Sequence, residues 1–124
     1  MKNVYLCCIL CLLAVCGQPA QEAGAVDLTA QAGDFVDLLV RGEYTRIVDL
    51  FDGKMREALP EGKIEEMWAA LQEKYGPFQR QVGMRQTKEH GFDCVYVTCS
   101  FEKKNIDIKV VYDKEQRVAG LWFR

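Results

Sequence analysis

Few residues in this 124-residue chain could act as a nucleophile or a general base. The single histidine, His90, stands beside Gly91, where a turn is expected. Cys94 follows four residues later, so His90 would have to reach it across that turn to activate the thiol. A general base is normally held in a cleft that shifts its pKa, whereas a histidine in a turn is usually solvated. No Ser-His-Asp or Cys-His-Asn set can be assembled, and the sequence favours a non-enzymatic protein.

Paired carboxylates are present, but on surfaces where solvent is expected. Asp34 and Asp37, and likewise Asp49 and Asp52, are spaced three residues apart and would share a helix face. General acid catalysis requires one carboxyl in an apolar pocket that raises its pKa, and these residues lie on the polar sides of their helices. The sequence has no Gly-rich phosphate loop, Walker sequence or metal-ligand spacing. We therefore expect no cofactor and no metal.

The six cysteines fall into two groups. Four lie in or beside an N-terminal apolar run, and only Cys94 and Cys99 belong to the folded part. These two are five residues apart on one expected strand, so their side chains point to opposite faces, about 16 Å apart. A disulfide requires Cα atoms within about 7 Å, and a zinc site requires further ligands. We expect two buried thiols that behave as small hydrophobic residues.

Residues 1–25 have the features of an export signal. Lys2 supplies a positive charge, and residues 4–15 form an apolar run of the length of a signal core. The run is too short for a helix that spans a hydrocarbon core of about 30 Å. A buried N-terminal strand or helix is the alternative. Because a linker-like stretch follows at residues 18–25, we expect a removable targeting segment.

The end of this segment leaves three possibilities open. Residues 13–16 (LAVC) are similar to a bacterial lipobox, in which Cys16 would be acylated, although Val15 replaces the usual small residue. Cleavage after Ala25, behind a small-x-small sequence, would release a soluble protein instead. An uncleaved anchor is the third possibility. The expected location is exported, as a cell-surface lipoprotein or a secreted protein, with membrane contact only through a lipid anchor.

Residues 26–124 are expected to form one domain. In the first half, apolar residues recur at spacings of three and four, which indicates amphipathic helices. Three helices are expected over residues 28–39, 44–51 and 60–75, with one further turn near residues 55–59 left open. Gly42 and Gly76 are placed to end the first and third helices, and Pro60 to open the third.

The second half of the chain changes to a period of two. Four strands are expected: one beginning at Phe78, and three over residues 92–101, 106–112 and 118–123. Phe78, Val82 and Met84 are expected to share one face of the first strand. Short polar connections, including His90 and Gly91, imply antiparallel hairpins. The predicted fold is α+β, with three N-terminal helices packed on a four-stranded antiparallel sheet.

Several segments along the chain resemble one family: Gly42-Glu43-Tyr44, Gly76-Pro77-Phe78, residues 95–101 (VYVTCSF) and Gly120-Leu121-Trp122-Phe123. They are similar to the domain of unknown function 3887, which occurs in exported bacterial proteins, alone or ahead of an α/β-hydrolase domain. The resemblance covers nearly all of residues 26–124. It implies a curved sheet covered by helices, a cone-shaped fold similar to nuclear transport factor 2. It implies no established activity and no catalytic residues, and this sequence has no Gly-x-Ser-x-Gly elbow.

One set of candidate binding residues is aromatic. Five rings could converge between the helices and the sheet and line a pocket for a small apolar ligand. The alternative is that they fill a small core. The residues are Tyr44, Phe51, Trp68, Phe101 and Trp122.

A second set could lie on the opposite face of the sheet. Alternate residues of the central strand and its neighbours would form an apolar patch typical of a partner or dimer interface. A solvated sheet face is the alternative. The residues are Tyr96, Thr98, Val111, Leu121 and Phe123.

Amino-acid composition and net charge exclude two further classes of function. The chain is 49% hydrophobic and 27% charged with a net charge of -2, so neither a disordered tail nor a nucleic-acid partner is expected. The preferred hypothesis is an exported, non-enzymatic binding domain that forms a homodimer through its sheet. One alternative is a small-ligand binder or vestigial enzyme that uses the cone pocket. Another is an accessory module of a separately encoded α/β-hydrolase.

Overall fold

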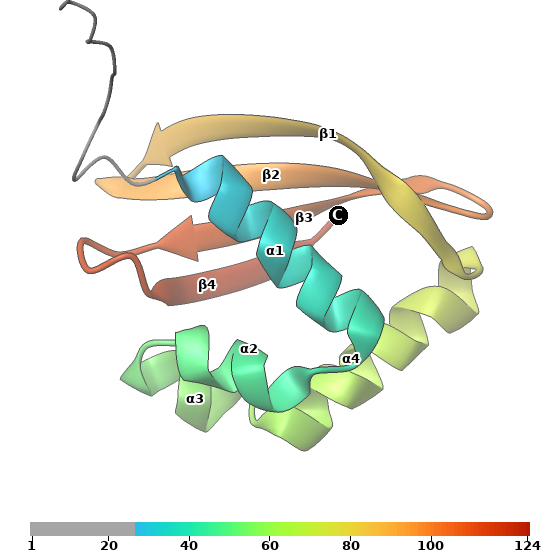
Figure 1. The fold of residues 1–124 in the computed structure, drawn as a ribbon, viewed down its shortest axis with the longest axis horizontal. Helices are drawn as coiled ribbons and strands as arrows, with labels where there is room; N and C mark the ends of the chain where they lie inside the picture. The colour runs from blue at the N-terminus through green and yellow to red at the C-terminus, as the bar shows by residue number, and fades with distance from the viewer. Residues whose placement is uncertain (1–26) are drawn as a thin grey trace, which may run out of the picture.

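The computed structural model describes residues 27–124 (Figure 1). The expected signal segment, including Cys16, lies outside the described residues. Four helices come first, and four strands follow. The helices are α1 (Leu28–Arg41), α2 (Tyr44–Leu50), α3 (Gly53–Ala58) and α4 (Glu61–Tyr75). The strands are β1 (Phe78–Glu89), β2 (Phe92–Phe101), β3 (Asn105–Tyr112) and β4 (Val118–Phe123).

The α+β prediction is confirmed, but the number of helices was wrong. The segment left open near residues 55–59 belongs to a separate helix, α3, so four helices precede the sheet rather than three. Phe51 has an extended backbone, which ends α2. The Asp52 carboxylate then accepts a hydrogen bond from the Met55 backbone N–H at 2.8 Å and caps a new helix.

Both ends of α1 follow from local chemistry. Asp27 accepts hydrogen bonds from the backbone N–H groups of Thr29 and Ala30, which satisfies donors of the first turn. Gly42 adopts a left-handed conformation with φ 74°, and its N–H donates to carbonyls of the last turn. The expected helix end at Gly42 is confirmed.

The sheet is antiparallel throughout, in the order β1-β2-β3-β4, as predicted. His90 and Gly91 form the two-residue turn between β1 and β2, with φ of 54° and 83°. Two positive φ values match the twist of a tight hairpin. The turn fixes the register in which Glu89 faces Phe92.

Strand β1 departs from the expected alternation. Its register to β2 shifts twice, between Phe78 and Arg80 and between Gln81 and Gly83. Val82 lies at the second shift and is 43% exposed, so it does not share a face with Phe78 as expected. A bulge adds a residue to one strand and bends it, and Figure 1 shows β1 curving over its neighbours.

All four helices contribute to one layer against one face of the sheet. Helix α1 crosses β1 and β2 closely, and a Cβ at Gly33 would lie 2.8 Å from the Met84 methyl carbon. Gln81 donates through Nε2 to the Gly33 carbonyl at 3.1 Å and fixes that crossing. Figure 1 shows α2 and α3 on the β4 side of the fold. Within residues 27–124, no helix has the length and apolar character needed to cross a bilayer.

Gly76 is required where α4 turns into β1. Its φ of 86° and ψ of 173° are accessible almost only to glycine, and a Cβ there would meet the Glu102 Cβ at 2.5 Å.

We predict that Gly76→Ala lowers the free energy of unfolding by about 1–3 kcal/mol, measured by urea denaturation. Gly62→Ala, where a Cβ meets nothing within 4 Å, is the control and should be neutral or stabilising. Equal effects of the two substitutions would contradict this assignment.

Candidate functional site

Most of the expected pocket rings fill the core. Trp68 and Phe101 are buried, with ring centroids 5.7 Å apart, and Phe78 completes a cluster with both. Phe51 is fully buried against Phe35, at 6.3 Å between ring centroids. These rings contact one another at ordinary packing distances, and none of them lines either of the two pockets described below.

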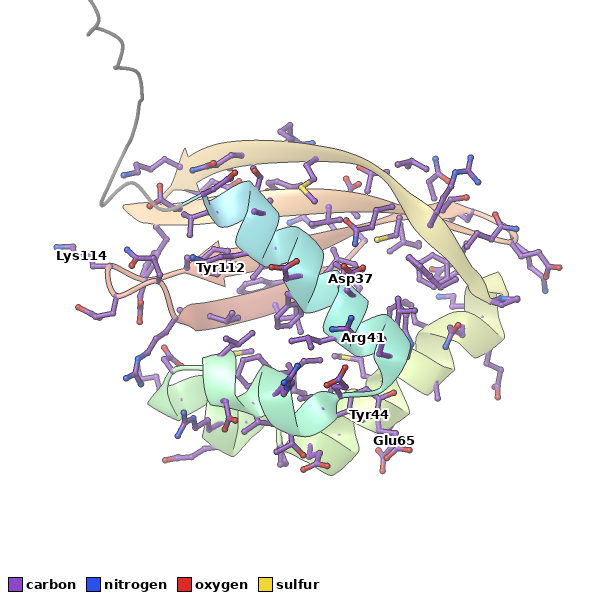
Figure 2. All side chains as sticks on the ribbon, viewed as in Figure 1. Asp37, Arg41, Tyr44, Glu65, Tyr112 and Lys114 are labelled. Carbon is purple, nitrogen blue, oxygen red and sulfur yellow. The ribbon has the colours of Figure 1, made fainter. Side chains whose placement is uncertain are left out.

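Two of the five expected pocket residues lie elsewhere. Tyr44 is half-buried at the edge of the core, on α2, and Figure 2 shows it near Glu65 of α4. Burial, and then the Glu65 charge, raise the pKa of Tyr44. Trp122 does not converge with the other rings, because it alternates with core-facing Leu121 and Phe123 along β4 and points to the opposite face. It is 51% exposed.

The same alternation corrects the expected interface. Tyr96, Thr98 and Val111 lie on the side of the sheet away from the helices, as expected. Leu121 and Phe123 do not, because they pair with core-facing residues of β3 and pack against the core. We call the side away from the helices the outer face. Its central side chains are Arg85, Thr87, Glu89, Cys94, Tyr96, Thr98, Lys109, Val111 and Trp122.

A carboxylate network organises the outer face. Glu89 accepts three hydrogen bonds: from the Tyr96 hydroxyl at 2.6 Å, from Lys109 Nζ at 2.8 Å and from the Thr87 hydroxyl at 2.9 Å. The Glu89 carboxylate of β1 therefore connects side chains of β1, β2 and β3. The hydrogen bonds from Lys109, Tyr96 and Thr87 lower the pKa of Glu89 to about 2. The same contact with Glu89 raises the pKa of Lys109.

Cations lie over the rings of this face. The Arg85 guanidinium stacks on Tyr96, 4.1 Å from the ring centroid. Lys109 lies 5.5 Å from the Tyr96 centroid and 5.4 Å from that of Trp122. Such contacts are attractive and cover aromatic surface with charged groups. Beneath these long side chains lies a second small cluster of Cys94, Tyr96 and Val111, on the side of the sheet opposite to helices α1–α4.

A pocket of about 230 Å³ opens on the outer face, and we call it the outer pocket. Its lining includes Glu89 together with His90 and Cys94, the two residues that the sequence separates by a turn. No hydrogen bond joins these three side chains: Glu89 is held by its three donors, and the Cys94 thiol donates to the Phe92 carbonyl at 3.9 Å. Burial, then the Glu89 charge, raise the pKa of Cys94. A nucleophilic cysteine requires the opposite shift.

The two thiols lie on opposite faces of β2, as predicted. Cys94 is in the outer cluster and Cys99 in the main core, both unpaired and buried. Burial, and then the Asp107 charge, raise the pKa of Cys99 to about 12. Within residues 27–124, no three acidic, histidine or cysteine side chains are close enough to hold a metal ion.

A second pocket of about 250 Å³, the end pocket, lies on the helical side where α1, the end of α2 and the β3–β4 turn meet. Its apolar walls are Leu38, Leu50 and Val118, and polar groups come from Gln31, Asp34, Tyr112 and Gln116. Sequence reasoning named none of these as site residues, although Asp34 was assigned to a solvated surface. The pocket joins segments that are far apart in the chain, so no local pattern indicated it.

The Glu89 network gives a pH-dependent prediction. Because its pKa is about 2 in the fold and ordinarily 4.5, Glu89 stabilises the fold above about pH 4.5, and this contribution is lost as the pH falls toward 2. We expect Glu89→Gln to be less stable than the parent protein at pH 7. The difference should shrink in urea denaturation at pH 2.5. Glu66→Gln, at an exposed position on α4, should show neither effect, and a difference for Glu89→Gln that does not vary with pH would contradict the assignment.

The raised thiol pKa values predict low reactivity. At pH 8, iodoacetamide should leave Cys94 and Cys99 unmodified in the native protein and alkylate both in urea, as measured by peptide mass spectrometry. Rapid native alkylation of Cys94 would show an accessible thiolate in the outer pocket.

Comparison with known proteins gives a family and nothing beyond it. Neither the curated proteins nor the solved structures contain a significant match to this chain. The family described as "Protein of unknown function (DUF3887)" matches residues 32–121, from α1 to β4. This span includes both the outer face and the end pocket. The chain belongs to the DUF3887 family.

Proposed function

We propose that this chain is an exported, non-catalytic binding domain that self-associates through the outer face of its sheet. The observation that carries the proposal is an uncovered sheet face with its own buried cluster, a pocket and half-exposed rings. Export is supported by the apolar run at residues 4–15. The lack of catalysis is supported by the carboxylate and thiol of the outer pocket, whose pKa values are shifted away from use as base and nucleophile.

The outer face presents aromatic surface that the fold does not use. Trp122 is 51% exposed and Phe92 is 43% exposed, and both border the outer pocket. In contrast, Cys94, Tyr96 and Val111 beside them are nearly inaccessible. Half-exposed aromatic rings around a preformed hollow are characteristic of interface centres.

The geometry fits a second copy of this chain. A two-fold symmetric interface places the same patch on both partners, so the patch must be complementary to itself. Here a projecting ring, Trp122, stands at the margin of a hollow with apolar walls of Phe92, Val111 and Ala119. A copy rotated by 180° can present its ring to that hollow.

The charges of the face permit the same pairing. Arg85 and Lys109 are balanced by Glu89 and Asp107, which pairs with the Thr98 hydroxyl at 2.6 Å. A patch with both signs does not repel its copy. Within residues 27–124, Arg85 has no carboxylate partner, so its guanidinium remains available to one on a second copy.

The face is large enough for a modest interface. Strands about 4.8 Å apart and residues about 3.3 Å apart give a four-stranded face of about 500 Å² over the paired length of β2 and β3. Projecting side chains raise this toward the about 800 Å² per partner of a standard complex. We therefore expect a dimer that dissociates on dilution.

We predict that the purified protein sediments with twice the chain mass at high concentration, and that Trp122→Glu reduces it to the monomer mass. The substitution removes the projecting ring and places a charge against the apolar walls of the partner's hollow. Val40→Glu is the matched control, because Val40 is 44% exposed on α1, away from the sheet, and should leave the dimer intact. Circular dichroism checks that both variants fold. A monomeric parent protein, or a dimer that persists in Trp122→Glu, would refute the proposal.

A further inference from the structure

The end pocket is a second site, separate from the outer face and independent of self-association. Phe51 and Val118 form a parallel bridge, and the Asp52 N–H donates to the Val118 carbonyl at 2.9 Å. These contacts hold the end of α2 against the start of β4. Helix α1 supplies the remaining wall through Asp34 and Leu38. The hollow is therefore built by three fixed elements.

One buried polar group in this pocket has no partner. Tyr112 is 3% exposed, and its hydroxyl makes no hydrogen bond to any residue in the described range 27–124. Buried hydroxyls are normally hydrogen-bonded. In Figure 2, Tyr112 lies beside the first half of α1, near the turn that carries Lys114. An unpaired hydroxyl that lines an open pocket is suited to a ligand.

The surrounding polar atoms are mainly acceptors. Burial is the main cause that raises the pKa of Tyr112, and the charge of Asp34, which lines the same pocket, adds to it. No hydrogen bond joins them. Gln116 uses its amide nitrogen to donate to the Lys114 carbonyl at 3.0 Å, so its amide oxygen remains free. Asp34 is the one residue lining the pocket that carries a charge at neutral pH.

We propose that the end pocket binds a small primary ammonium with a short aliphatic chain, its nitrogen held by Asp34, Tyr112 and Gln116. An ammonium has three N–H donors and no acceptor, which matches the Asp34 carboxylate, the Tyr112 hydroxyl oxygen and the Gln116 amide oxygen. The positive charge balances Asp34. Leu38, Leu50 and Val118 contact the aliphatic chain.

The volume limits the size of the ligand. At about 30 Å³ for each water, 250 Å³ corresponds to about eight waters. A chain of about six carbons with one nitrogen fits this space. Amines with much longer chains would exceed this volume.

The test is a titration of the ¹⁵N-labelled protein with n-hexylammonium, followed by amide chemical shifts in NMR. Hexan-1-ol and hexanoate are matched in length but neutral and anionic. We expect saturable shifts centred on the end pocket with hexylammonium, binding at least about tenfold weaker with hexanol, and none with hexanoate. Equal binding of hexanol and hexylammonium, or shifts centred on the outer pocket, would overturn the proposal.

Two variants identify the groups that hold the nitrogen. Asp34→Asn should weaken hexylammonium binding at least about tenfold, because it removes the counter-charge. Tyr112→Phe should weaken it about threefold or more while leaving the melting temperature equal or higher, since the lost hydroxyl has no internal partner. Glu73→Gln on the exposed side of α4 is the charge-matched control and should bind as the parent protein does. Undiminished binding by Asp34→Asn would refute the assignment even if the pocket binds amines.

Discussion

The strict alternation of side chains across β2 and β3 is the constraint on which the rest of this structure depends. β2 is central, and its residues are buried on both faces. Val95 and Val97 point toward α1 and complete the core. Cys94 and Tyr96, which alternate with them along β2, point the other way and belong to the outer cluster. A shift of one residue in register would exchange the two sets. The tight turn at His90 and Gly91 prevents that shift at one end of β2.

The outer face shows how one carboxylate can organise a sheet surface. Glu89 stands at the end of β1, next to the turn, and gathers donors from three strands. Each hydrogen bond to the ionised carboxylate makes it a weaker base, so the arrangement that orders the surface also removes the reactivity of the group. Arg85 and Lys109 lie over the rings of the same face and cover part of its aromatic surface with charged groups.

The two pockets differ in the kind of surface that they offer to a partner or ligand. In the outer pocket the Glu89, Lys109 and Cys94 side chains have hydrogen-bond partners, and exposed aromatic surface is what remains. In the end pocket apolar residues form part of the wall, and the Tyr112 hydroxyl has no partner within residues 27–124. Apolar surface is covered best by a partner with its own apolar surface, whereas an unpaired polar group requires a specific donor or acceptor. Because of this contrast, we propose a protein partner for the outer face and a small cation for the end pocket.

Local patterns in the sequence were sufficient for most of the fold. The spacing of apolar residues located α1, α2 and α4, the glycines at 42 and 76 ended two of them, and the period of two with short turns gave four antiparallel strands. The pattern left α3 open as one possible turn, because a six-residue helix capped by Asp52 has no buried residue to create a period. It missed the bulges of β1, which interrupt the alternation that it relied on.

The site residues depended on relations that the sequence does not contain. The alternation within β2 correctly separated Cys94 from Cys99, but the phase of β4 relative to β3 was open, so Trp122 was assigned to the core and Phe123 to the surface, the reverse of their positions. Which face a strand turns inward is set by its pairing with a neighbour. By itself the sequence determined the elements, their order and the scarcity of reactive groups, because these depend on neighbouring residues. Only the tertiary structure decided that Glu89 meets Lys109 and that Asp34 and Tyr112 line one pocket, because those positions depend on register and on how helices cross the sheet.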